Sequence, residues 1–443
     1  MWYSIDFNPH FFEDSKVKPL AAIAALTVTF GATGCESEAS RGAIDPPPTP
    51  PPIEAISPAF DPSFPEMSPE REALLASSWE IYKERFIQGD GRVIDREADD
   101  RSISEGQAYA MLRAVFADDR PTFDRTLQWS ESNLERQSLG LGSDRLWAWK
   151  WGKKPNGEWG ILDPNFASDA DIDAIFALIL AARRWQHPEY LDLARVKLVD
   201  LWEYSTFKVE ASGKRYLLPG PKDAFVPEPS LIYLNPSYLA PYAFRVFAQV
   251  DEERDWFALV GSSYEILERS GKLSRVGLPS DWVALDTQTD RYQTLARADN
   301  LRSQYAFDAY RVWWRVLLDK AWFGAPEATD FLQEHLQYPI ERWREDKKIV
   351  AEIDLQGQPL VEYEATAQYA MLYPALVAIE PAIAAEILAE KIIDRYDRGF
   401  WDNDTAYYTQ NLAWLGLFPP SAIDSQLLQP PQGSPEPTPE ASP

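Results

Sequence analysis

Three aspartates at alternate positions form the densest group of chemically useful side chains in this sequence. Asp169, Asp171 and Asp173 lie in ASDADIDAIFALILAARRW, residues 167–185, just before a run that is apolar on every side. Carboxyl groups at the mouth of a buried helix can donate or accept protons. Acidic residues are also common in the first turn of any helix, where they cap the backbone and interact favourably with the helix dipole. This stretch alone leaves both interpretations open.

Two other segments place one carboxylate each at the start of an apolar helix. Glu105 lies in SEGQAYAM, and burial beside aromatic residues would raise its pKa and suit it to act as a general acid. Asp308 lies in FDAYRV, three residues before Arg311, and an ion pair between them would keep Asp308 ionised, as a general base requires. The alternatives are a capping glutamate and a purely structural ion pair.

Apolar residues recur at helical spacing along most of the chain, whereas strand-like alternation is short and rare. Helices are expected at 69–87, 104–116, 121–135, 169–185, 190–204, 236–249, 252–270, 303–318, 329–344, 364–377, 382–396 and 405–415, with short strands near 207–217 and 349–353. Some of these helices are apolar on all faces, such as 104–116, 169–185 and 303–318, and others carry charge on one side. Alternation of buried and half-buried helices predicts an all-α toroid of helical hairpins in two concentric rings.

The composition excludes several classes of function. The formal net charge of −26 argues against nucleic-acid partners, because phosphate binding needs clustered Lys and Arg. Three histidines and one cysteine argue against structural zinc, disulfides and a Ser-His-Asp site, so we expect no metal. The 17 Trp and 20 Tyr residues can form flat apolar platforms with a polar edge, which suit stacking against sugar rings.

Both ends of the chain differ from its middle. Residues 1–35 resemble a signal peptide with an apolar run at 20–30, and Ala32-Thr33-Gly34-Cys35 resembles a lipoprotein signal in which Cys35 is lipidated. An ordinary secretory signal is the alternative. Residues 36–67 form a Pro-rich linker, and residues 426–443 a Pro-, Glu- and Ser-rich tail expected to be disordered. We therefore expect a periplasmic or cell-surface protein tethered by a lipid at Cys35.

Seven motifs in one order resemble glycoside hydrolase family 8, closest to the secreted endoglucanases associated with bacterial cellulose synthesis. They are SEGQAYAM at 104–111, LWAWKWG at 146–152, LDPNFASDAD at 162–171, NPSYLAPYAFRVF at 235–247, GLPSDW at 277–282, FDAYRV at 307–312 and YYTQNLAWLGL at 407–417. The resemblance covers residues 68–418 and implies a catalytic domain at 68–425 with an (α/α)6 barrel of twelve helices, in agreement with the helical pattern.

The resemblance implies an inverting endo-hydrolase of β-1,4-linked glucans that needs no cofactor. By this resemblance Glu105 is the general acid, Asp308 is the general base, and Asp169 holds the sugar at the cleavage point and stabilises its transition state, with Asp171 in support. Three further residues are expected to contact the sugar chain: Trp149, Tyr238 and Arg311.

The sequence departs from the family's pattern at two places and leaves two other functions open. Ala174-Ile175 reverses the usual order of a bulky aliphatic residue and Ala, and Phe307 stands where many relatives have Tyr, which removes a hydroxyl near the base.

The substrate could instead be chitosan or another β-1,4-glycan, or the protein could be a non-catalytic, surface-tethered glucan-binding lipoprotein. We expect a monomer that acts on a polysaccharide the cell exports, with the polysaccharide synthesis machinery as a possible partner.

Overall fold

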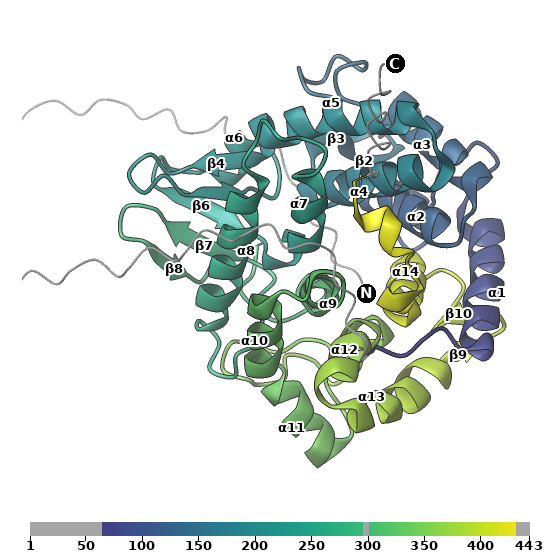
Figure 1. The fold of residues 1–443 in the computed structure, drawn as a ribbon, viewed down its shortest axis with the longest axis vertical. Helices are drawn as coiled ribbons and strands as arrows, with labels where there is room; N and C mark the ends of the chain where they lie inside the picture. Colours follow the sequence, from purple (N-terminus) through teal and green to yellow (C-terminus); the bar gives the residue numbers. More distant parts are fainter. Residues whose placement is uncertain (1–63, 296–300, 431–443) are drawn as a thin grey trace, which may run out of the picture. The chain divides into compact units, whose positions relative to one another are not determined.

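The computed structural model describes residues 64–295 and 301–430 (Figure 1). The contacts divide the chain into residues 1–52 and 53–443, and every described residue belongs to the second unit. The signal peptide, Cys35 and nearly all of the Pro-rich linker therefore lie outside the described residues, as do residues 431–443 of the tail. None of the helices in the described residues combines the length and the apolar character needed to span a bilayer.

Six helices of the described residues form an inner ring and are buried along almost their whole length (Figure 1). They are α2 (Ser104–Phe116), α4 (Ser168–Trp185), α7 (Pro241–Phe247), α9 (Tyr310–Phe323), α12 (Thr366–Ile379) and α14 (Tyr407–Leu417). Their lack of a polar face follows from this position, because each is enclosed by neighbours in the ring and by an outer helix.

Outer helices cover this ring, and each inner helix packs against an outer one (Figure 1). They are α1 (Pro69–Phe86), α3 (Arg120–Asn133), α5 (Pro188–Ser205), α8 (Trp256–Gly271), α10 (Pro326–His335) with α11 (Gln337–Asp346), and α13 (Pro381–Ile387), which continues as a π-helical turn at Leu388–Ile393. The pairs are α1 with α14, α2 with α3, α4 with α5, α7 with α8, α9 with α10, and α12 with α13. This arrangement confirms the predicted (α/α)6 barrel.

Short antiparallel strands connect the helices. Three strands form one sheet in the order β1 (Ser102–Ile103), β2 (Ala148–Lys153) and β3 (Trp159–Phe166), and three form another in the order β6 (Leu231–Leu234), β7 (Val283–Asp286) and β8 (Arg291–Gln293). Two hairpins complete the set, β4 (Thr206–Lys208) with β5 (Arg215–Leu217) and β9 (Tyr396–Asp397) with β10 (Phe400–Trp401). Only β4 and β5 fall where the sequence predicts strands. Near 349–353 the structure has an isolated bridge between Ile353 and Tyr305.

Three predicted helices differ most from the observed ones. The helix predicted at 303–318 begins at Tyr310, because the residues before it bend around Asp281, which accepts the backbone N–H groups of Ala306 and Ala309 at 3.2 and 2.8 Å. The helix predicted at 236–249 begins at Pro241, because a proline disfavours helical geometry in the residue before it. The helix predicted at 329–344 is two helices, α10 and α11.

The packed region continues past residue 425. Leu427 and Leu428 are buried in a 3-10 turn at Ser425–Leu428. The guanidinium of Arg183 donates to the Leu427 carbonyl at 2.8 Å, and the side-chain amide of Gln249 donates to that of Leu428 at 3.0 Å. Residues 426–430, which were predicted to lie in the tail, therefore belong to the barrel.

Candidate active site

The β1-β2-β3 sheet holds the starts of two inner helices side by side. Strand β1 leads directly into α2, and β3 leads into α4 through Ala167. The central strand β2 pairs with both, Lys150 opposite Ile103 and Ala148 opposite Phe166. Glu105 and Asp169 are the second residues of α2 and α4. The sheet therefore brings two carboxylates, 64 residues apart in sequence, to the same end of the barrel.

Arg311, the second residue of α9, joins these carboxylates to a third. Its Nη1 donates to Asp169 Oδ2 at 2.7 Å and to Glu105 Oε1 at 3.1 Å, and its Nη2 donates to Asp308 Oδ1 at 3.0 Å. We call Glu105, Asp169 and Asp308 the carboxylate cluster. The capping interpretation of Glu105 is not observed, because residue 103 is the N-cap of α2 and makes no side-chain capping bond.

A second group of polar side chains fixes the orientation of Arg311 and Asp308. Asn235 Nδ2 donates to Asp308 Oδ2 at 3.1 Å, so both oxygens of this carboxylate accept a hydrogen bond. The Ser237 hydroxyl donates to Asn235 Oδ1 at 2.7 Å and accepts from Arg311 Nη2 at 2.9 Å. The Tyr238 ring lies 5.3 Å from the Arg311 guanidinium carbon. Asp308 therefore has one defined position.

Burial raises the proton affinities of two members of the cluster, Glu105 and Asp308. The side chains of Glu105 and Asp308 are 18% and 28% exposed, whereas Arg311 is 3% exposed. Burial raises the pKa of Glu105 to about 7, although the charge of Arg311 acts to lower it. The predicted ion pair between Arg311 and Asp308 is present, yet burial outweighs it and the pKa of Asp308 is also raised. Near neutral pH Glu105 can therefore hold the proton that a general acid donates.

The other two aspartates of the opening group face different partners. Asp173 forms a bidentate ion pair with Arg315, with both contacts at 2.8 Å, one helical turn deeper in the barrel. Asp171 Oδ1 accepts the backbone N–H of Trp147 at 3.0 Å, and burial raises the pKa of this carboxyl to about 8. Asp169 is the member of the trio that binds Arg311.

The remaining candidate residue, Trp149, lies half-buried on β2, the strand between those that lead to Glu105 and Asp169. Its ring is 5.3 Å from the Lys150 ammonium. This position puts Trp149 at the end of the barrel that carries the cluster.

Several site residues lie in the family motifs of the sequence, but no role was predicted for them. Asn235 and Ser237 lie in NPSYLAPYAFRVF, Tyr109 in SEGQAYAM and Asp281 in GLPSDW. The Tyr109 hydroxyl accepts from Arg311 Nη1 at 3.3 Å, and Asp281 holds the backbone on either side of Asp308. The sequence signal that could have pointed to these residues is a polar side chain inside an otherwise apolar motif.

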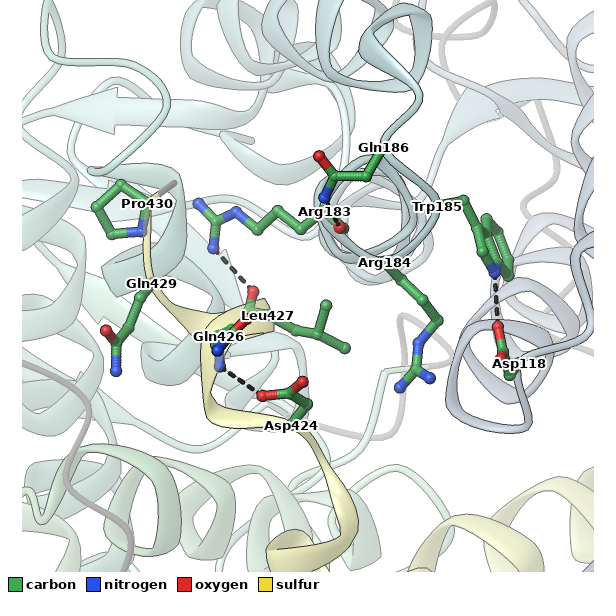
Figure 2. A pocket seen from close by; sticks show the side chains of 10 residues that line it. All are labelled: Asp118, Arg183, Arg184, Trp185, Gln186, Asp424, Gln426, Leu427, Gln429 and Pro430. Atoms are coloured by element: carbon green, nitrogen blue, oxygen red, sulfur yellow. Dashed lines mark hydrogen bonds between the residues drawn. The ribbon is translucent and has the colours of Figure 1, made fainter. Parts of the chain in front are cut away.

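A separate hollow of about 550 Å³ lies at the opposite, C-terminal end of α4 (Figure 2). Its lining includes Arg183, Arg184, Trp185 and Asp424, and Figure 2 shows the Trp185 indole hydrogen-bonded to Asp118, at 2.7 Å. Among the described residues that line it, none belongs to the carboxylate cluster. This hollow is therefore a feature of the join between α4 and the C-terminal segment.

The grouping with metal-ligand geometry also lies outside the cluster. In the described part of the chain it comprises Glu268, Glu334 and His335, whose ligand atoms lie within 4.8 Å of one another. In the carboxylate cluster the position of a central cation is filled by the Arg311 guanidinium, which binds all three carboxylates.

Comparisons with known proteins identify the family of the chain. The family model for glycosyl hydrolases family 8 matches residues 68–418. An endoglucanase from Pseudomonas fluorescens (strain SBW25) is 34% identical over 260 residues, which cover 58% of this chain and 62% of the relative. An endoglucanase from Escherichia coli (strain K12) is 36% identical over 238 residues, which cover 53% of this chain and 60% of the relative.

A solved structure extends the likeness to the fold. The endo-1,4-D-glucanase from Vibrio fischeri ES114 superposes with a TM-score of 0.65 at 27% identity, over 77% of this chain and 93% of that chain. The alignments with the two curated relatives, in contrast, span less than two thirds of each relative's length.

Proposed function

This chain belongs to glycosyl hydrolases family 8, and from that membership we propose that it hydrolyses internal β-1,4-glucosidic bonds of cellulose or a related β-glucan. The observation that carries the proposal is the carboxylate cluster, in which residues from three separate segments meet on one guanidinium. A pair of carboxyl groups in different protonation states is what glycoside hydrolysis requires. The relatives named as endoglucanases support the choice of substrate.

The reaction proceeds with inversion at the anomeric carbon. Glu105 donates its proton to the glycosidic oxygen as the bond to the leaving sugar breaks. Asp308 takes a proton from a water molecule that attacks the anomeric carbon from the opposite face. Asp169 stabilises the positive charge that develops on the sugar ring.

The surrounding contacts fit these roles. Asp308 accepts a hydrogen bond on each oxygen, from Arg311 and from Asn235, and a carboxylate has further lone pairs with which to accept one from water. Glu105 accepts from Arg311 through Oε1, so its acidic proton can be carried on Oε2. Trp149 and Tyr238 offer ring faces for the sugar chain.

The activity should follow a bell-shaped pH profile. Above a pH of about 7 Glu105 loses the proton that it must donate, so the alkaline limb of kcat/KM should fall near that value. At low pH Asp308 becomes protonated, and because its pKa is raised the acid limb should lie above the ordinary range of an aspartate. Initial rates on carboxymethylcellulose across pH 4 to 9 measure both limbs. A rate that has not begun to fall by pH 9 would contradict the role of Glu105.

Reducing-sugar release tests the substrate and the reaction together. We expect hydrolysis of carboxymethylcellulose, and proton NMR of the first products from a cello-oligosaccharide should show the α-anomer, as inversion requires. Chitosan, mixed-linkage glucan and xylan are assayed in parallel. The net charge of −26 favours chitosan as the second candidate, because that chain is cationic. Binding of glucans without hydrolysis of any of these substrates would instead indicate a binding protein.

We also propose that a lipid at Cys35 tethers the enzyme outside the cytoplasmic membrane. The apolar run, the Ala32-Thr33-Gly34-Cys35 segment and the Pro-rich stretch that follows support this arrangement. Replacing Cys35 with Ser should move the protein from the membrane fraction to the soluble fraction of cells. An unchanged distribution would overturn the tether and leave the enzymatic proposal intact.

A further inference from the structure

A hollow of about 580 Å³ lies on the flank of the barrel, between the loop that joins α1 to β1, the outer helix α3 and the β2–β3 hairpin. We call it the tryptophan hollow. Its volume falls within the range of small-ligand sites. The residues that define it are Gln88, Arg92, Gln128, Trp129, Trp151 and Trp159.

An aromatic platform forms one wall of the hollow. Trp159, which is 46% exposed, stacks on Trp151 with ring centroids 5.2 Å apart and planes inclined by 20°. The buried Trp129 packs edge-to-face with Trp151, with ring centroids 5.3 Å apart and planes inclined by 81°. The result is an exposed indole on a fixed aromatic base.

Arg92 contacts both indoles of this platform and holds them in a fixed position. Its guanidinium carbon lies 4.5 Å from the Trp151 ring and 4.6 Å from the Trp159 ring. The same guanidinium donates to the Ser102 hydroxyl at 2.8 Å and to the Asp100 carbonyl, so it is held by the loop next to β1. Because the indoles are already ordered, a ligand that stacks on them loses little of its binding energy to side-chain ordering.

Polar side chains surround the platform. Gln128 and Ser132 are exposed on the same face of α3, four residues apart, and Gln88 and Asp90 are exposed on the facing loop. Amide, hydroxyl and carboxylate groups beside an aromatic face match the two surfaces of a pyranose, whose C–H face stacks on a ring and whose equatorial hydroxyls form hydrogen bonds. The charge of the protein disfavours an anionic polysaccharide at this surface.

We propose that the tryptophan hollow is a second carbohydrate-binding site, which holds a neutral β-linked glucan chain away from the reaction centre. The choice of glucan rests on the proposed function. The site itself rests on the platform and its polar rim. Its role is to retain long or insoluble chains on the enzyme between cleavage events.

The hollow is distinct from the carboxylate cluster. Its lining comes from the α1–β1 loop, α3, β2 and β3, and among the described residues that line it none belongs to an inner helix. Trp159 pairs with Lys153 at the outer end of the hairpin, whereas Asp169 follows the other end of β3. Eight residues of strand put these two ends about 20 Å apart.

The test compares binding to a long chain with turnover of a short one, in the full-length protein. Trp159→Ala should weaken binding to hydroxyethylcellulose in affinity electrophoresis about tenfold, which corresponds to about 1.4 kcal/mol. The same variant should hydrolyse cellopentaose with kcat/KM within about twofold of wild type, since the cluster is untouched. Trp159→Phe keeps an aromatic face and should retain most of the binding. Tyr204→Ala, which removes an exposed aromatic residue from α5, is the matched control and should bind as wild type.

Each outcome separates this inference from the proposed function. Equal retention of wild type and Trp159→Ala would overturn the second site, even if hydrolysis is normal. A parallel loss of retention and of cellopentaose hydrolysis, in a variant with unchanged melting temperature, would make Trp159 part of the reaction centre and also overturn it. Trp159-dependent retention by a wild-type protein that hydrolyses none of the glycans would support the site and refute the proposed function. Binding of a Pro-rich peptide in place of glucan would overturn it.

Discussion

Replacing Glu105 with Gln is expected to lower kcat on carboxymethylcellulose by about 10² to 10⁴-fold, the range in which a single general acid contributes. The amide has the size of the carboxylic acid but cannot transfer a proton to the glycosidic oxygen. It can still accept the hydrogen bond that Arg311 Nη1 donates to Oε1 at 3.1 Å, so the geometry of the cluster should persist. Substrate binding should therefore change little, and the loss should lie in kcat rather than in KM.

A matched variant isolates the chemistry of Glu105 from its charge. Glu84→Gln changes the same functional group at an exposed position of α1 and should leave kcat unchanged. An aryl cellobioside with a good leaving group, such as dinitrophenyl, needs little protonation, so it should recover part of the lost rate in Glu105→Gln. A variant that retains more than a tenth of the wild-type kcat on carboxymethylcellulose would refute the role of Glu105 as the acid.

The periodicity of the sequence predicts the ring of helices because a buried helix leaves a distinct signature. The segment of α4 between Ala174 and Ala181 is apolar on every face, and a helix with no polar stripe must be enclosed. The strands leave a weaker signal. Strands β2 and β3 are short and irregular, with bulges near Lys150, so no clean alternation of polar and apolar residues marks them.

The sequence predicts the individual residues of the site but not the contacts between distant segments that bring them together. Spacing along one helix gives the contact between Asp308 and Arg311, three residues apart. It cannot give the contacts from Arg311 to Glu105 and Asp169, which lie 206 and 142 residues away and depend on the β1-β2-β3 sheet. Local pattern also placed Asp308 inside a helix, whereas Asp281, 27 residues earlier, holds it in the turn before Tyr310.

The resemblance to the family gives the catalytic roles of the carboxylates, which residue spacing alone does not predict. From the pattern alone, an ion pair with Arg311 predicts an ionised Asp308, and the structure adds that burial raises the pKa of this carboxyl despite the pair. Burial depends on neighbours from other segments, such as Asn235, so its effect on proton affinity is not readable from the sequence around Asp308.

Replacing Arg311 with Met should have a different and broader effect than the loss of either catalytic carboxyl. Three carboxylates would then share a buried space without their common cation, and breaking such a contact costs about 3–5 kcal/mol of unfolding free energy. Because Arg311 acts to lower the pKa values of Glu105 and Asp308, both should rise, and the acid limb of the activity profile should move to higher pH. At neutral pH we expect kcat to fall by at least about a hundredfold, since less of the base is ionised and neither carboxyl is held in position.

The dependence of stability on pH should show whether the shifted activity profile of Arg311→Met comes from changed pKa values or from general destabilisation. The pKa of Glu105 is higher in the native protein than in the unfolded chain, so the native state binds more protons and its stability falls as pH rises from about 4.5 to 7. In Arg311→Met this decline should be steeper and extend to higher pH. The control is Arg245→Met, which breaks an equally buried ion pair with Asp319, with contacts at 2.7 and 3.1 Å, away from the cluster. That variant should lose comparable stability but keep the pH limbs of the wild type. If both variants shift the limbs alike, the shift reflects general destabilisation, and Arg311 does not set the proton affinities of Glu105 and Asp308.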